Sequence, residues 1–280
     1  MSFSINTNAG ALFALQSLSK TNSELNTVQS RINTGLKVGS AKDNAAVFAI
    51  AQGQRADLAG LDSVKGSLDR ASSSLNVALA AAEAVSDLLI ELKAKASAAA
   101  DPGADAASRT ALNDEFKNLI AQINTVVDNA EFNGVNAVKN GGASIQALVA
   151  TPDGSGTAAT YSITIAATDI SASSGLALTT GQVITSAAAA STALTTITAA
   201  EGTLNTFLSQ LGAGARRVDI QRAFTDKLSD AIEIGIGNLV DADLARESAN
   251  LQSLQVKQQL GLQALSIANQ APGSVLALFR

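Results

Sequence analysis

The sequence predicts a mainly α-helical protein: a long, coiled-coil-like helical bundle with paired terminal helices and a small β-hairpin region. Three features predict this fold class, namely a long heptad repeat in the first half, matching apolar stripes at the two ends, and a composition poor in aromatic residues. Of the 280 residues, 46% are hydrophobic but only 3% are aromatic. Because aromatic side chains usually supply much of the area of a compact core, this composition favours long helices packed side by side.

The longest predicted helix lies in the first part of a core helical rod, which we place at residues 41–140. Apolar residues recur at two heptad positions from residue 47 to residue 92, interrupted only at Gln54 and Asp57, and such a seam is typical of coiled coils. The spacing of Ser40 and Asp43 predicts a capping box at the start of this helix. The predicted seam residues are Val47, Ile50, Leu61, Val64, Leu68, Leu75, Val85, Leu89 and Leu92.

The rest of the rod and one β-hairpin follow in order. A second helix is expected from about Asp105 to Asn129, and the Asn133-Gly134 pair predicts a turn after it because both residues tolerate positive φ. Residues 141–186 are rich in Ser and Thr. Two strand-like segments there, 144–151 and 160–166, predict a hairpin followed by a short surface loop. Helical spacing returns over 187–239, the last helix of the rod.

The two ends, residues 1–40 and 240–280, form a matched pair of apolar, thinly charged helices. A helix with an apolar stripe and few charges on its back needs neighbours on several sides. On the pattern alone, two interpretations stay open: a hairpin of the two termini within one bundle, or packing of both helices into an assembly of many copies. The predicted stripe residues are Leu12, Leu15, Leu18, Leu25, Val28, Ile32, Leu244, Leu251, Leu254, Leu262 and Leu265.

The composition also excludes several classes of function. Without Cys or His, the chain cannot build the usual zinc or iron sites, a Cys nucleophile or a His general base, so we expect no enzyme, metal or cofactor. A net charge of −5 disfavours nucleic-acid binding. No apolar run is long enough to span a membrane, and no secretory signal precedes the predicted helices. The acidic residues Asp241, Asp243 and Glu247 are interpreted as a solvated or salt-bridged helix face.

Several stretches resemble a known family. Residues 32–50, with the run Ser40-Ala-Lys-Asp-Asn-Ala-Ala46, closely resemble the amino-terminal signature of bacterial flagellins. Glu131-Phe-Asn-Gly134 resembles the turn after that family's second core helix. The stretches 241–247 and 263–272 resemble its carboxyl-terminal signature, and Ile5-Asn-Thr-Asn8 its opening. The chain is therefore identified as a member of the flagellins, of the short alphaproteobacterial type without an outer domain.

The resemblance implies a structural subunit that is secreted and polymerises into the extracellular filament of the bacterial flagellum, used for swimming motility. Its partners would be further copies of itself, the flagellar export apparatus and chaperone, and the cap and hook-junction proteins, with no nucleic acid and no membrane insertion. The terminal helices would become ordered on assembly. A hook–filament junction protein is the alternative. A secretion-apparatus translocator is disfavoured because such proteins usually carry an apolar membrane-inserting segment.

One position departs from the family pattern. The patch that the vertebrate toll-like receptor recognises in many flagellins includes an Arg-Glu-Leu triplet on the long helix. The corresponding residues of this chain are Ile90, Glu91 and Leu92, so the charged anchor of the triplet is missing. The resemblance therefore implies weak or absent activation of this receptor.

Overall fold

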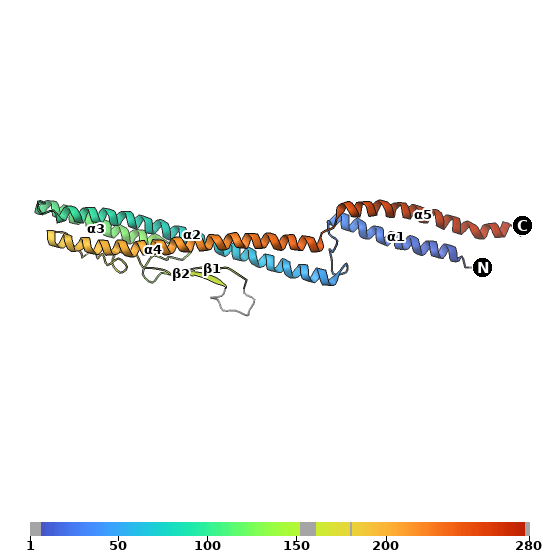
Figure 1. Cartoon of the computed structure of the whole chain (residues 1–280), viewed down its shortest axis with the longest axis horizontal. Coiled ribbons are helices and arrows are strands. Elements are labelled where there is room, and N and C mark those ends of the chain that lie inside the picture. The colour runs from blue at the N-terminus through green and yellow to red at the C-terminus, as the bar shows by residue number, and fades with distance from the viewer. Residues whose placement is uncertain (1–6, 152–160, 180, 278–280) are drawn as a thin grey trace. The chain divides into compact units, whose positions relative to one another are not determined.

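A computed structural model describes residues 7–151, 161–179 and 181–277 of the chain. The fold class is confirmed, since long helices and one two-stranded antiparallel hairpin account for the regular structure of these residues (Figure 1). No helix in the described ranges is both long and apolar enough to cross a membrane. The elements are α1 (Ala9–Thr34), α2 (Ala45–Ala100), α3 (Ala106–Asn129), β1 (Ile145–Leu148), β2 (Ser162–Ile165), α4 (Ala187–Val240) and α5 (Leu244–Ala277).

The chain forms two compact units, one of residues 57–230 and one that combines residues 1–56 with residues 231–280. We expected boundaries near residues 40 and 240 from the sequence, whereas the divisions fall inside α2 and α4. The reason is a small apolar cluster that joins the beginning of α2 to the end of α4, with Ala51, Ile236 and Val240 buried in it. The first turns of α2 therefore pack with the terminal unit.

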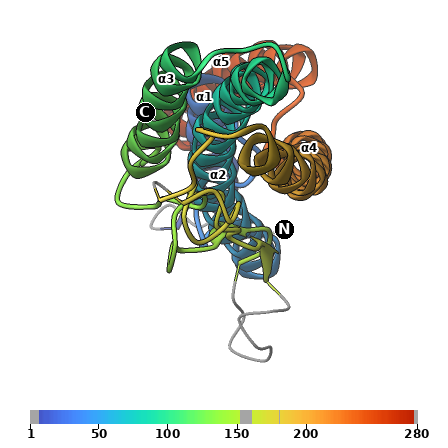
Figure 2. The ribbon, with the colours of Figure 1, turned by 90° about the vertical axis from the view of Figure 1, so that its left-hand side faces the viewer.

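Within the unit of residues 57–230, α3 and α4 both pack on α2 (Figure 2). Ion pairs at the rim connect the same helices, from Lys93 Nζ to Glu201 Oε2 at 2.7 Å and from Lys95 to Glu115. The predicted seam of α2 is buried at seven positions: Leu61, Val64, Leu68, Leu75, Val85, Leu89 and Leu92. The heptad spacing thus marks the face of α2 that carries the core of this unit.

The predicted seam differs from the structure at Ile50. Val47 is half-buried, and Ile50 is 55% exposed. Here the inward face of α2 carries Val47 and Ala51, one turn apart, which pack in the cluster around Ile236. Ile50 lies beside that face rather than on it, so its assignment to the seam is corrected for the single chain.

The start of α2 also differs from the sequence prediction. Its N-cap is Asn44, whose Oδ1 accepts a hydrogen bond from Val47 N at 3.2 Å. The Asp43 carboxylate instead accepts hydrogen bonds from the amides of Gly39 and Ser40 and from the Ser40 hydroxyl. The spacing of Ser40 and Asp43 therefore produces a turn just before the helix rather than a capping box.

The turn after α3 is confirmed. Phe132 and Val135 exchange two backbone hydrogen bonds, of 2.9 and 3.0 Å. Between them Asn133 and Gly134 have φ values of 50° and 79°, the left-handed conformation that Asn and Gly adopt at low cost.

The hairpin is confirmed as well, although its ladder is shorter than the predicted segments. Ile145 pairs with Ile165 and Leu148 with Ser162, while the predicted turn at residues 152–156 lies outside the described residues. One face of the hairpin is buried on α4, where a Cβ at Gly214 would lie only 2.8 Å from Ile165 Cδ1. The Leu148 amide donates to Ser67 Oγ on α2 at 2.9 Å, so the hairpin is fixed to both long helices.

The segment between β2 and α4 is more than the surface loop expected from its Ser and Thr content. It contributes Ile170, Leu178 and Ile184 to the core, all fully buried. Two side chains of α3 satisfy its backbone: Asn113 Oδ1 accepts from the Ile184 amide and Asn124 Oδ1 from the Ala172 amide, both at 3.0 Å. Because polar groups of the backbone are paired in this way, the segment can be packed without regular structure.

Asp169 organises the first turn of this segment. Burial raises the pKa of its carboxyl, but hydrogen bonds from Ser171 and Ser174 outweigh burial and hold the pKa below the usual 3.8. A pKa lowered by folding gives stability that is complete above the unfolded-state pKa and is lost as the pH falls through the folded-state pKa.

We therefore expect Asp169→Asn to lower the melting temperature by a few degrees at pH 7. Below about pH 4, the melting temperature of the variant should fall less with decreasing pH than that of the unmodified chain. Circular dichroism melts of both chains from pH 7 to pH 3 measure this. Asp87→Asn, at an exposed position of α2, is the control. Equally steep acid destabilisation of Asp169→Asn and the unmodified chain would contradict the prediction.

Candidate self-association site

The helices α1 and α5 pack against each other as an antiparallel pair (Figure 1). Three contacts along their length establish the direction and register. Asn8 Nδ2 donates to the Ala268 carbonyl at 2.6 Å, Gln258 Nε2 donates to Asn22 Oδ1 at 2.8 Å, and Arg31 Nη1 lies 3.4 Å from Glu247 Oε1. As the residue number rises along α1, its partner on α5 falls.

The contact faces follow a strict alternation of three and four residues, the spacing of a coiled-coil seam. Between Leu244 and Gln270, every residue of α5 that is not exposed falls on this repeat: Glu247, Leu251, Leu254, Gln258, Gly261, Leu265 and Ala268. The seam of α1 consists of Ala11, Ala14, Leu18, Thr21, Leu25, Val28 and Ile32. Small residues let the helices approach closely towards the termini, where a Cβ at Gly261 would lie 3.3 Å from Leu18 Cδ1.

The predicted stripe residues divide into two groups. The structure brings seven of them into the seam: Leu18, Leu25, Val28, Ile32, Leu251, Leu254 and Leu265. The other four, Leu12, Leu15, Leu244 and Leu262, are exposed. They are accompanied by exposed apolar residues outside the predicted stripe, namely Phe13, Val256, Leu260 and Ile267. The uninterrupted three–four spacing of the seam is the signal that would have separated the two groups.

The connections at the base of the helix pair are held by backbone hydrogen bonds. The amides of Lys37 and Val38 both donate to the Val240 carbonyl, at 2.7 and 3.2 Å, and the Ala242 amide donates to the Gly35 carbonyl at 2.8 Å. Gly35 ends α1 with a φ of 71°, which Gly adopts without strain. The chain therefore leaves α1 and enters α5 at one defined place.

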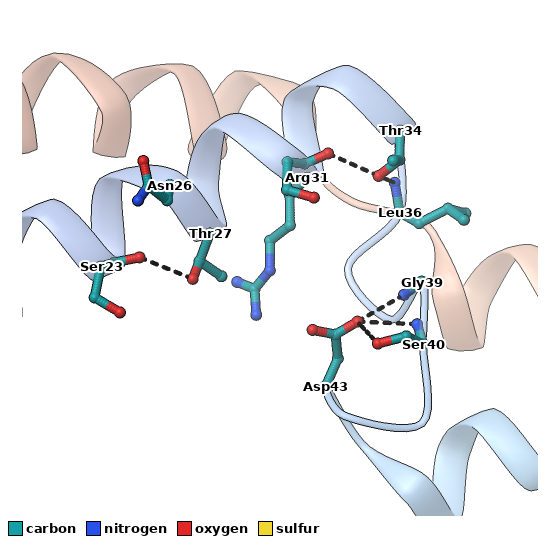
Figure 3. A pocket seen from close by; sticks show the side chains of 10 residues that line it. Ser23, Asn26, Thr27, Arg31, Thr34, Leu36, Gly39, Ser40 and Asp43 are labelled. Atoms are coloured by element: carbon teal, nitrogen blue, oxygen red, sulfur yellow. Dashed lines mark hydrogen bonds between the residues drawn. The ribbon is translucent and has the colours of Figure 1, made fainter.

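A polar hollow lies beside these connections (Figure 3). One wall is a face of α1 that includes Asn26, Thr27 and Arg31, and the other is the turn around Asp43. Hydrogen bonds from the Ser40 hydroxyl and amide hold the pKa of Asp43 below its usual value. Asp43 thus remains an ionised carboxylate that organises the turn, and its chemistry is structural.

The acidic residues near the start of α5 are each engaged locally. Asp243 caps the helix, since its Oδ1 accepts from the amides of Ala245 and Arg246 at 3.1 Å. Glu247 pairs with Arg31, and the backbone of Asp241 bridges to Leu36. In the part of the chain that the structure describes, no group of acidic residues is arranged to hold a metal ion. The interpretation of a salt-bridged face applies to Glu247.

Comparison with known proteins assigns this arrangement to a family. Residues 5–140 match the model of the bacterial flagellin N-terminal helical region, and residues 194–279 match that of the bacterial flagellin C-terminal helical region. Flagellin FljK of Caulobacter vibrioides is 50% identical over 277 residues, which cover 99% of this chain and 98% of that protein. The chain belongs to the bacterial flagellins.

A flagellin of Brucella melitensis is 39% identical over 282 residues, with 99% of each chain covered. These relatives and the family matches show that this flagellin is a structural subunit of the extracellular flagellar filament. No observation favours the junction-protein alternative. Between the two matched regions, the described residues form the hairpin and the segment packed on the core, so they add no outer domain. The flagellin is therefore of the short type.

Residues 90–92, which the resemblance compares with the receptor patch, lie on α2 in the unit of residues 57–230. Leu92 is fully buried, while Glu91 is exposed and Ile90 is 60% exposed. Ile90 is thus an apolar side chain that is exposed in the single chain.

Proposed function

We propose that the antiparallel pair of α1 and α5 is the element through which this flagellin polymerises. The observation that carries the proposal is the exposed apolar surface that remains after the two helices have paired. Phe13 is 73% exposed and Leu12 62%, and five large apolar side chains of α5 are 49–69% exposed: Leu244, Val256, Leu260, Leu262 and Ile267. Large exposed apolar patches mark sites of association. Neighbouring copies of the chain are the surface that would cover them.

The sparse burial within the pair supports a coupling of folding to polymerisation. Ordering the backbone costs about 1–2 kcal/mol per residue, while full burial of an aliphatic side chain stabilises by about 1.5–3 kcal/mol. Among the residues of the pair whose burial the structure describes, only Leu25, Val28 and Leu254 are buried apolar residues. Two helices of 26 and 34 residues therefore depend on contacts with other subunits. Contacts of this kind between unlike faces produce an open helical polymer rather than a closed ring.

The experiment that tests the proposal is the substitution Leu251→Asp. Leu251 lies in the seam against the cluster of Leu25 and Val28, where an unpaired carboxylate is costly. We expect no filaments from the purified variant after seeding, by electron microscopy and sedimentation. Far-ultraviolet circular dichroism and limited proteolysis should still show a folded unit of residues 57–230.

Leu251→Met is the matched control, because it preserves the apolar volume and such exchanges usually cost less than about 1.5 kcal/mol. It should polymerise normally. Filaments of ordinary length from Leu251→Asp would rule out the α1–α5 seam as an assembly element.

The further partners of the flagellin are also proposed, from the family resemblance. They are the flagellar export apparatus and chaperone, the cap and the hook-junction proteins. A chain without Cys has no disulfide to hinder export in an unfolded state, which supports this route. We further propose that the chain has no catalytic activity, since it also lacks His, and that it needs no cofactor.

A further inference from the structure

We propose that the ion pair between Arg31 and Glu247 sets the register of the α1–α5 pair, as a positioning contact for assembly. This inference rests on the proposed function, because it concerns the helix pair that we assign to polymerisation. Several alignments of the two helices would bury similar apolar surface, so the apolar stripe alone does not select one of them. The ion pair does.

Glu247 occupies the first seam position of α5, and it is the one charged residue among the described seam positions of both helices. It is only 8% exposed, which is rare for a glutamate unless it is paired. Its partner Arg31 is adjacent to the seam residue Ile32, and the Arg31 side chain is also partly buried. A single buried polar contact at a seam position is the best-attested device for fixing the register of a coiled coil.

The geometry of the contact argues against a role in stability alone. Arg31 Nη1 lies 3.4 Å from Glu247 Oε1, a long distance for a charged hydrogen bond. Two further polar atoms of the pair, Arg31 Nε and Glu247 Oε2, are buried without a hydrogen-bond partner. Removing an ion pair from water costs free energy. When its hydrogen-bonding atoms are satisfied only in part, the attraction between the two charges does not fully offset this cost. Its benefit must then lie in how it discriminates among alternative alignments.

The apolar seam leaves such alternatives open. Because both seams repeat every seven residues, moving α5 along α1 by one heptad again brings seam positions together. In one direction this slip would place Glu247 opposite Leu25, and in the other it would place Arg31 beside Leu254. Either slip breaks the ion pair and leaves a charge against apolar residues. Both slips are therefore penalised by the same contact.

Engineered disulfides can report the register, because the natural chain contains no Cys. In the native register a Cβ at Gly261 would lie 3.9 Å from Leu18 Cβ, close to the mean of about 3.8 Å in disulfides. Leu18→Cys with Gly261→Cys thus reports the native alignment. Leu18→Cys combined with Leu254→Cys or with Ala268→Cys reports a slip by one heptad in either direction. Each pair is oxidised in assembled filaments of the full chain.

The reporters are combined with three versions of the contact: the native pair, the neutral variant Arg31→Met with Glu247→Leu, and the charge-reversed variant Arg31→Glu with Glu247→Arg. Native filaments should form the 18–261 disulfide in large excess over the slipped ones. In the neutral variant we expect the ratio of native to slipped disulfides to fall by about tenfold or more. The charge-reversed variant should restore the native ratio of these disulfides.

An unchanged ratio in neutral filaments would overturn the inference. If the neutral variant forms no filaments, the test depends on whether the charge-reversed variant polymerises. Restored filaments with the 18–261 disulfide support the register role, and a charge-reversed chain that fails to polymerise overturns it. Failure of the proposed function gives a different result: Leu251→Asp would then form filaments of ordinary length, whatever the ratio of disulfides.

Discussion

Removal of residues 261–280 is expected to give a soluble flagellin subunit that does not polymerise. The truncation deletes three seam positions of α5, Gly261, Leu265 and Ala268, together with the exposed Leu262 and Ile267. The shortened helix would lose much of its contact with α1 and much of the apolar surface that we assign to neighbouring subunits. Because ordering each residue costs about 1–2 kcal/mol, what remains of α5 would lack the burial to stay ordered.

Electron microscopy and sedimentation after seeding measure this outcome, with the full chain as the control. The truncated chain should retain its unit of residues 57–230, whose core contains none of the deleted residues. Circular dichroism and limited proteolysis check that the unit remains folded. Normal filaments assembled from the truncated chain would refute the role of α5 in polymerisation.

The second large effect concerns the vertebrate toll-like receptor. We expect weak activation by this flagellin, and stronger activation by the variant Ile90→Arg. Ile90 is mostly exposed and belongs to a helix that is otherwise well packed, so an Arg can be accommodated there without loss of core. A buried charged anchor contributes about 2 kcal/mol or more at an interface hot spot, which corresponds to about a thirtyfold change in affinity.

Dose–response curves on receptor reporter cells measure the prediction, with a strongly stimulatory flagellin as the reference. The matched control is Ile90→Lys, because Lys carries the same charge without the planar, bidentate donor group of Arg. Ile90→Lys should raise receptor activation clearly less than Ile90→Arg does. Activation by the natural chain equal to that of the reference, or no gain from Ile90→Arg, would contradict the expectation.

The elements with strong spacing were predictable from the sequence. The bounds of α3 and the two strands of the hairpin fall close to the predicted residues, because turn residues and strand-like segments delimit them locally. The α2 seam from Leu61 to Leu92 was predictable from its heptad spacing. The helix ends were less so: the cap of α2 depends on which of several polar side chains reaches an amide, and Asn44 does so.

Features that depend on distant partners could not be read from the pattern. Ile50 falls on the heptad pattern and Ala51 does not, yet packing against Ile236 buries Ala51. The Ser- and Thr-rich segment before α4 has a loop-like composition, yet Asn113 and Asn124 pair with its backbone and permit its burial. The candidate site was predictable as a stripe, whereas its division into seam and exposed residues required the partner helix.

The anchoring of the hairpin has a consequence for how this flagellin can change in length. Gly214 and Ser67 hold the strands against α4 and α2, and the Val149 amide donates to the Tyr161 carbonyl at 2.7 Å. The two ends of the intervening connection are therefore closed by the fold itself. The entropy of closing a loop grows only logarithmically, by about 0.6 kcal/mol for each doubling of its length. Insertions at this point therefore add a small cost that grows slowly with their length, and they change no residue of the α1–α5 pair that we propose for polymerisation.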